Sequence, residues 1–243
     1  SDSLNNRYKA YYNIILADAK IEIGDYNVDD LLSQSIDYFM ATDEHEHFAR
    51  AKYLEGLCYI FRGDYINAKE DLLEAYVSYK RAQIASGQIR CLNRLAYISY
   101  HLGDNYGTKY TLNKCISTID ANDDRRLALA KANRALFNLR MGSLIECTSE
   151  LLLIEKTIYT CGNEHRLNFH LRLAKAYALL ADYPKAITQL EKAKPYLNDY
   201  KRQKAIYHKY YGWILNLQGS HKAALAELNK GLKIGLDIAQ ESF

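Results

Sequence analysis

Residues 56–75 read GLCYIFRGDYINAKEDLLEA and contain the signals for two helices joined by a tight turn. Gly63 can adopt the left-handed backbone conformation that ends an α-helix, because it has no side chain to clash. The Asp64 side chain can then accept hydrogen bonds from the unpaired backbone amides at the start of the next helix. The stretch therefore predicts one helix that ends at Gly63 and a second that begins beside Asp64.

The same kind of turn recurs along the whole chain at a nearly constant spacing. The turns start at Gly24, Gly63, Gly103, Gly142, Ala181 and Gly219, in steps of 39, 40, 39, 39 and 38 residues. Such self-similarity is typical of repeat proteins, in which each unit packs on its neighbours. The sequence therefore predicts an all-α fold in one solenoid domain over residues 1–243. Its six helix pairs are expected at about residues 5–42, 45–83, 86–120, 124–160, 163–196 and 200–240.

Residues at fixed distances from each turn are small or apolar. Seven residues before the turn stand Ala17, Gly56, Ala96, Ala135, Ala174 and Gly212. Five residues after it stand Ala68, Thr108, Cys147, Ala186 and Ala224, and nine residues after it stand Leu72, Leu112, Leu151, Leu190 and Leu228. Small side chains let two helices approach closely, and leucine fills the groove between neighbouring pairs. These columns predict closely packed antiparallel pairs.

The first pair departs from the register of the others. Its corresponding column residues are Val28, Leu32 and Ser35, each one position earlier than the spacing in the later pairs. The offset predicts that the first turn is one residue shorter, an irregularity expected of a terminal repeat.

Composition excludes several classes of protein. Hydrophobic residues make up 49% of the chain, which predicts a folded protein. The formal net charge of +3 is small, so no strong electrostatic attraction for a polyanion such as nucleic acid is predicted. The chain has neither an apolar run of about 18 residues nor an evident signal peptide, so no membrane segment is expected. The five cysteines are odd in number and lack C-x-x-C spacing, which predicts a reducing, cytoplasmic compartment rather than a disulfide framework.

Catalytic and cofactor motifs are missing from the sequence. The common phosphate-binding, dinucleotide-binding, zinc-hydrolase and serine-hydrolase signatures do not occur, so neither an enzyme nor a cofactor is predicted. Glu44-His45-Glu46-His47 has metal-ligand residue types, but its two histidines, two positions apart, would not share a helical face. We interpret this segment as a solvated loop and helix start, and no metal site is expected.

The turn and column residues resemble those of the tetratricopeptide repeat (TPR) family, and the resemblance covers nearly the whole chain. Its best match contains Gly56, Tyr59, Gly63, Tyr65, Ala68, Leu72 and Ala75. The period near 39 exceeds the usual 34 or so, as in the long repeats of bacterial regulators and of kinesin light chains. The resemblance implies a right-handed α–α superhelix whose first helices line a concave groove for a protein or peptide.

That geometry implies groove positions on the first helix of each pair. The expected contacts are Tyr53, Asn93, Tyr97, Tyr100, Arg140, Asn168, Lys175 and Trp213. Aromatic rings offer large contact areas, and asparagine amides can bind both polar groups of a peptide backbone. The alternative is that several of these rings pack between adjacent repeats, since most large aromatic side chains serve packing.

Three functions fit these features. The first is an interaction module within a larger signalling or transcription-regulating protein. The Ser at position 1 suggests a processed chain or a fragment of a longer one, although a missing start codon would look the same. The second is a stand-alone assembly scaffold, and the third is a receptor that binds a small ligand in the aromatic groove. The apolar segment 231–238 predicts either a further helix or self-association through the C-terminal helices.

Overall fold

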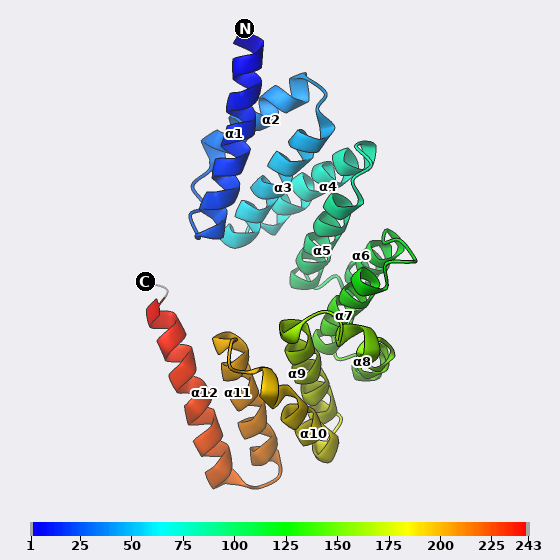
Figure 1. Ribbon diagram of the computed structural model, residues 1–243, viewed down its shortest axis with the longest axis vertical. Helices are drawn as coiled ribbons and strands as arrows, with labels where there is room; N and C mark the ends of the chain where they lie inside the picture. Colours follow the sequence, from blue (N-terminus) through cyan, green and yellow to red (C-terminus); the bar gives the residue numbers. More distant parts are fainter. Residues whose placement is uncertain (1, 242–243) are drawn as a thin grey trace. The chain divides into compact units, whose positions relative to one another are not determined.

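The computed structural model describes residues 2–241, and within them the chain forms twelve α-helices, one short 3-10 helix and no strand (Figure 1). The α-helices are α1 Asp2–Glu22, α2 Asp29–Ala41, α3 His45–Arg62, α4 Tyr65–Arg81, α5 Ala85–His101, α6 Asn105–Ser117, α7 Asp124–Arg140, α8 Leu144–Ile158, α9 Asn163–Leu179, α10 Tyr183–Ala193, α11 Lys201–Leu217 and α12 His221–Glu241. The 3-10 helix η1 is Lys194–Tyr196. The predicted all-α class is confirmed.

The helices fall into two compact units that divide between Asp120 and Ala121. Unit 1 contains α1 to α6, and unit 2 contains α7 to α12. In each unit consecutive helices form three pairs, and each pair packs on the next. The six predicted pairs are confirmed with boundaries within a few residues of those expected. That all six form one domain stays a prediction.

The turns within the pairs have the predicted backbone conformation. Gly24, Gly63, Gly103, Gly142 and Gly219 have φ angles between 77° and 85°, and Ala181, the single non-glycine among the six, also has a positive φ, of 60°. Asp64, Asp104 and Asp182 each accept a hydrogen bond from the backbone amide three residues later. Ser143 makes no such bond, so capping by the residue after the turn is confirmed for these aspartates but not for Ser143.

The small-residue columns lie at the helix contacts, as predicted. A Cβ atom added to Gly56 would lie 2.9 Å from Cγ of Leu72 and 3.3 Å from the carbonyl oxygen of Ala68, the two partners that the columns imply. The column leucines are buried except Leu228, which is 38% exposed. Leu228 lies on α12, on which no further helix pair packs among residues 2–241.

The first pair shows why its register differs. Val28, Leu32 and Ser35 are buried, so the predicted register is confirmed. The predicted cause is wrong, because α2 begins five residues after Gly24, whereas α4 begins two residues after Gly63. A non-helical residue advances the chain by up to about 3.3 Å and a helical residue by about 1.5 Å. The non-helical residues 25–28 therefore reach the first column in one residue fewer.

Candidate functional site

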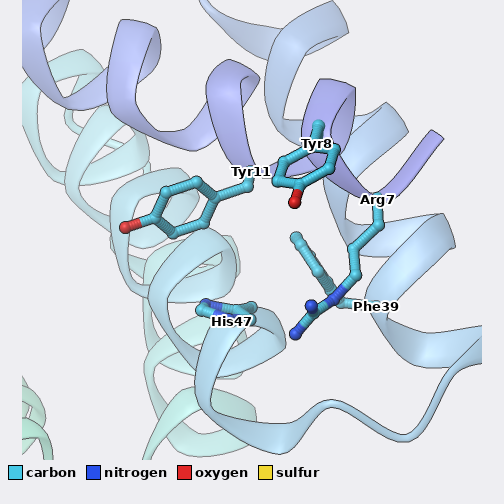
Figure 2. A pocket seen from close by; sticks show the side chains of 5 residues that line it. All are labelled: Arg7, Tyr8, Tyr11, Phe39 and His47. Carbon is cyan, nitrogen blue, oxygen red and sulfur yellow. The ribbon is translucent and has the colours of Figure 1, made fainter. Parts of the chain in front are cut away.

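Unit 1 contains a pocket of about 300 Å³ beside its N-terminal helix, which we call the N-terminal pocket (Figure 2). It is lined by Arg7, Tyr8 and Tyr11 of α1, Phe39 of α2 and His47 of α3. Phe39 is 1% exposed, whereas Tyr8 and Tyr11 are 65% and 39% exposed. The His47 ring centroid lies 4.9 Å from that of Phe39 and 5.2 Å from that of Tyr11. Aromatic side chains from three helices thus surround one open space.

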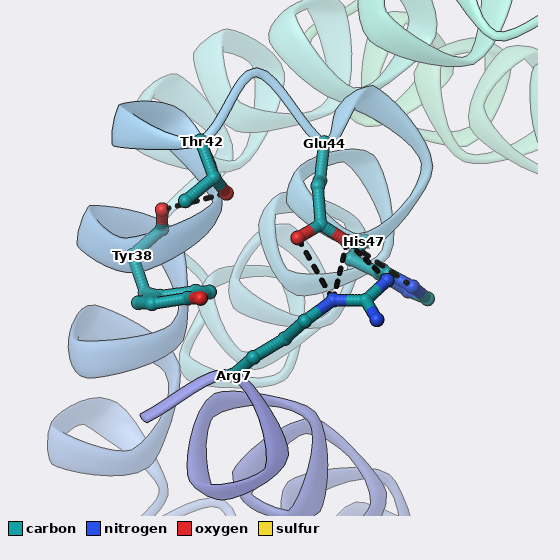
Figure 3. Close-up of polar contacts among 5 residues, drawn as sticks. All are labelled: Arg7, Tyr38, Thr42, Glu44 and His47. Atoms are coloured by element: carbon teal, nitrogen blue, oxygen red, sulfur yellow. Dashed lines mark hydrogen bonds and ion pairs between the residues drawn. The ribbon is translucent and has the colours of Figure 1, made fainter. Parts of the chain in front are cut away.

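A bidentate ion pair fixes one edge of the N-terminal pocket (Figure 3). Arg7 donates from Nε to Oε1 of Glu44 at 3.0 Å and from Nη2 to Oε2 at 2.9 Å. The hydrogen bonds from Arg7 are the main reason why the pKa of Glu44 lies below its usual value. Nε2 of His47 lies 3.8 Å from the same carboxylate. Because Glu44 balances the charge of Arg7, the pocket suits an apolar or aromatic group better than a free ion.

The Glu44–His47 segment is where α3 begins, as predicted, and two of its side chains, Glu44 and His47, contribute to the pocket. His47 lines the wall, and His45 lies 3.4 Å from Asp43. Among the described residues, no group of three or more His, Cys, Asp and Glu side chains could hold a metal ion.

The predicted contacts in unit 1 have different surroundings. Tyr53 is 7% exposed, and the guanidinium carbon of Arg90 lies 5.2 Å from its ring centroid. The ring is thus covered by packing between α3 and α5, as in the packing alternative, and its role as a partner contact stays a prediction. Asn93 is partly exposed, and its Oδ1 lies 3.8 Å from the thiol of Cys115. Tyr100 is also partly exposed, and its ring meets that of His101 edge to face at 5.4 Å.

Tyr97, which is partly exposed, takes part in an aromatic cluster that the sequence did not reveal. Its ring centroid lies 4.2 Å from that of His101. The His101 ring in turn stacks on Tyr65, the tyrosine of the second turn, with 5.4 Å between the ring centroids. The first turn repeats this contact, since Tyr26 stacks at 4.3 Å on Phe61. A turn tyrosine in unit 1 therefore packs against the end of the next first helix, which is the packing alternative considered for such rings.

Three first helices of unit 2, α7, α9 and α11, lie beside one another and supply four positive charges, which we call the cationic cluster. Arg172 and Lys175 lie one turn apart on α9, Arg140 is the last residue of α7, and Lys209 lies on α11. Nη1 of Arg172 donates to the backbone carbonyl of Ala132 at 2.6 Å. The predicted contacts Arg140 and Lys175 belong to this cluster, whereas sequence analysis missed Arg172.

Burial and neighbouring cations both disfavour the charged forms of Arg172 and Lys175. Burial is the main cause that lowers the pKa of Lys175, and the charges of Lys209 and Arg140 lower it further. Burial also lowers the pKa of Arg172 to about 10, with a further contribution from Arg140. Within the part of the chain that the structure describes, no carboxylate lies within ion-pair distance of Arg172 or Lys175. Three carboxylates of unit 2 pair with other cations: Glu150 with Arg134 at 2.9 Å, Glu155 with Lys192 at 4.0 Å and Glu227 with His208 at 2.7 Å.

The remaining predicted contacts of unit 2 are partly exposed. Asn168 lies one turn before Arg172, so that Asn168, Arg172 and Lys175 share one face of α9. Trp213 lies one turn after Lys209 on α11 and packs partly against the core of unit 2.

Comparisons with known proteins identify the fold. No protein-family model and no curated protein matches the sequence. PilF of Pseudomonas aeruginosa matches with a TM-score of 0.64 and 13% identity, over 94% of this chain and 92% of that one. The nearly identical TPR-like repeats of a candidate kinesin light chain from Podosopora anserina match with a TM-score of 0.63 and 16% identity, over 78% and 95%. MamA of Desulfovibrio magneticus matches with a TM-score of 0.55 and 16% identity, over 78% and 96%.

The chain has the TPR fold. The resemblance predicted from the turn and column residues is thereby confirmed, and the α1–α2 to α11–α12 pairs are its repeats.

The five cysteines of these TPR repeats are unpaired and buried. Burial raises the pKa of the thiols of Cys58, Cys115 and Cys147 to about 11 and that of Cys91 to about 12. Such thiols remain protonated at neutral pH and are poor nucleophiles. None of the helices within residues 2–241 has the length and apolar character needed to cross a membrane.

Proposed function

We propose that the chain is a protein- or peptide-binding TPR module that serves as the regulatory or interaction domain of a larger signalling or transcription-regulating protein. The observation that carries the binding role is the N-terminal pocket. Its floor, Phe39, is buried, whereas at its mouth Tyr8 is largely and Tyr11 partly exposed to water. Exposed rings around a concave apolar surface are typical of interaction sites, because a partner that covers them removes apolar area from water.

The occupant that fits best is one large apolar or aromatic side chain carried by a partner. A ring inserted over Phe39 could contact Tyr8, Tyr11 and His47 with offset or edge-to-face geometry. The partner's backbone would then run along α1, where the exposed side chains of Tyr12 and Ile15 extend the surface.

The sequence-predicted contacts supplement this pocket. In unit 1 we retain Asn93, Tyr97 and Tyr100, which are partly exposed, and in unit 2 Arg140, Asn168, Lys175 and Trp213. Five buried, unpaired thiols support a reducing, cytoplasmic compartment.

The pocket is tested with a phage-displayed library of random twelve-residue peptides selected on the chain. Selected peptides are titrated against the wild type, the Tyr8→Ala/Tyr11→Ala variant and the control variant Tyr106→Ala/Tyr110→Ala. The control removes two exposed tyrosines of α6 in the same unit. We expect the peptides to share a large apolar residue and to lose at least about tenfold in affinity with the pocket variant only, the equivalent of about 1.4 kcal/mol. An equal loss with both variants would contradict the proposal.

A small-ligand receptor is the second candidate, because a volume of about 300 Å³ also suits a small molecule. Titration with indole and p-cresol, the ring portions of Trp and Tyr side chains, distinguishes the receptor from the peptide-binding module. Binding of either compound as tightly as the selected peptides would favour the receptor.

The regulatory context is tested by the reading frame of the gene. A flanking DNA-binding or NTPase segment supports the regulatory role, and a chain bounded by start and stop codons at these ends supports the scaffold alternative.

A further inference from the structure

The cationic cluster has a charge arrangement that folding alone does not require. Arg172 and Lys175 are part-buried. The positive charge of Arg140 acts on both of them, and that of Lys209 acts on Lys175. Buried charges in proteins are normally paired, because an unpaired charge loses its hydration without compensation. Among the side chains that the structure describes, no carboxylate forms an ion pair with Arg172 or Lys175.

The hydrogen bond of Arg172 does not explain the cluster. Its Nη1 donates to the carbonyl oxygen of Ala132, a bond that a neutral donor could also make. Lys175 has no hydrogen-bond acceptor among the described residues, yet it lies where burial and two positive neighbours disfavour its charge. A part-buried lysine between other cations, with no anion beside it in the described part of the chain, has the surroundings of a binding site for an anionic group.

We propose that the cationic cluster of unit 2 binds the carboxylates of an acidic segment of a partner protein. This inference rests on the proposed function, because it names the chemistry of the protein that the module captures. A guanidinium can bind one carboxylate through two parallel hydrogen bonds, and the lysines at 175 and 209 act as point charges for further carboxylates.

A protein segment suits the cluster better than a nucleic acid. The cluster contributes four charges from three helices, and the whole chain has a formal net charge of only +3. Nucleic-acid binding typically requires a longer track of cations along the phosphate backbone. The Asn168 amide and the Trp213 ring, on the same helices, offer contacts for a peptide backbone and an apolar side chain.

The test measures fluorescence polarisation of a labelled peptide of eight glutamates and of its counterpart with eight glutamines. The variant is Lys175→Gln/Lys209→Gln, which keeps Arg172 and its bond to Ala132. The matched control is Lys156→Gln/Lys222→Gln, which removes two exposed lysines of the same unit and the same net charge. A labelled single-stranded RNA of eight uridines is the third probe.

The glutamate peptide is expected to bind the wild type at least about tenfold more tightly than the glutamine peptide in 50 mM salt. Its affinity should fall about tenfold in the Lys175→Gln/Lys209→Gln variant, change less than about twofold in the control, and weaken in 200 mM salt, where screening is stronger. The variant should melt no lower than the wild type, since it relieves repulsion, and a lower melting temperature would assign these lysines a structural role instead.

Equal binding of the glutamate peptide to both variants would overturn the proposal. The proposal would also be overturned if the RNA bound more tightly than the glutamate peptide and lost about tenfold in affinity in the Lys175→Gln/Lys209→Gln variant. That result would assign the cluster to nucleic acid. If the glutamate peptide fails to bind while phage-selected peptides still occupy the N-terminal pocket, the inference about the cluster is refuted and the proposed function stands. If neither binds, both are refuted.

Discussion

Gly212 on α11 and Gly235 on α12 belong to one helix pair, yet a methyl group added at each is expected to change stability in opposite directions. At Gly212 a Cβ atom would lie 2.7 Å from Cγ of Leu228 and 2.9 Å from the carbonyl oxygen of Ala224. Both distances are far below van der Waals contact, and the second involves backbone that cannot rotate away. At Gly235 no atom lies within 4 Å of the added Cβ.

The two magnitudes follow from the same terms. Replacing a helical glycine by alanine stabilises a helix by about 0.5–1 kcal/mol. Overfilling a close-packed contact costs about 1–3 kcal/mol, and the helix term offsets about 0.5–1 kcal/mol of it, so Gly212→Ala should lower the free energy of unfolding by up to about 2.5 kcal/mol. Gly235→Ala gains the helix preference of alanine without any overfilling, so it should raise the free energy of unfolding by about 0.5–1 kcal/mol.

The measurement is urea and thermal unfolding followed by circular dichroism at constant pH. One kcal/mol corresponds to a shift in melting temperature of roughly 2–4 °C for a chain of this size. Gly212→Ala should therefore melt several degrees below Gly235→Ala. If Gly212→Ala stabilises as much as Gly235→Ala, α11 and α12 do not approach closely, and the argument that glycine at this column position permits close packing is refuted.

The remaining predictions concern the turn, the core and pH. Ala181→Gly should raise the free energy of unfolding by about 0.5–1 kcal/mol in urea titrations, because it removes a left-handed alanine with φ of 60°. Ala174→Leu should lower it by about 1–3 kcal/mol, since Ala174 is fully buried at a helix contact, and an unchanged urea midpoint would count against the column register. His170 is fully buried between Gln189 and Tyr159, each 2.8 Å from one ring nitrogen, and burial lowers its pKa. Its stabilising effect should be present above pH 6.5 and be lost as the pH falls below that value. The urea midpoint should therefore fall more steeply between pH 7.5 and 5 for the wild type than for His170→Gln. Subtracting the midpoints of the variant from those of the wild type removes the contributions of other titrating groups.

The turns and the packing columns were predictable because their causes are local. A left-handed residue followed by a capping side chain is determined within three or four positions, which is why the period identified Ala181 although it is not glycine. Likewise a position that meets another helix backbone accepts only small residues, and its spacing from the turn is fixed by helix geometry.

The N-terminal pocket and the cationic cluster were not predictable in the same way. The pocket requires Tyr8, Phe39 and His47 to meet, and their distances depend on how α1 and α3 cross, which no short segment determines. The sequence could have indicated Arg172 as a groove position, because it lies four residues after Asn168 on the same helical face. Its burial and its missing carboxylate, however, depend on side chains of other helices.

The register also separates packing positions from recognition positions. The position six residues before the turn is partly exposed in all repeats except the second, where Leu57 is buried. The residues at this position are Asp18, Leu57, Tyr97, Leu136, Lys175 and Trp213. By contrast, the position seven residues before the turn is buried in every repeat and is always Ala or Gly. A position that meets another backbone must repeat the same small side chain, whereas a position that faces outward is free to differ from repeat to repeat. Binding specificity in this chain is therefore expected in the variable column. Tyr53 lies outside this column, four residues before Leu57, and its ring packs beneath Arg90 of the next first helix.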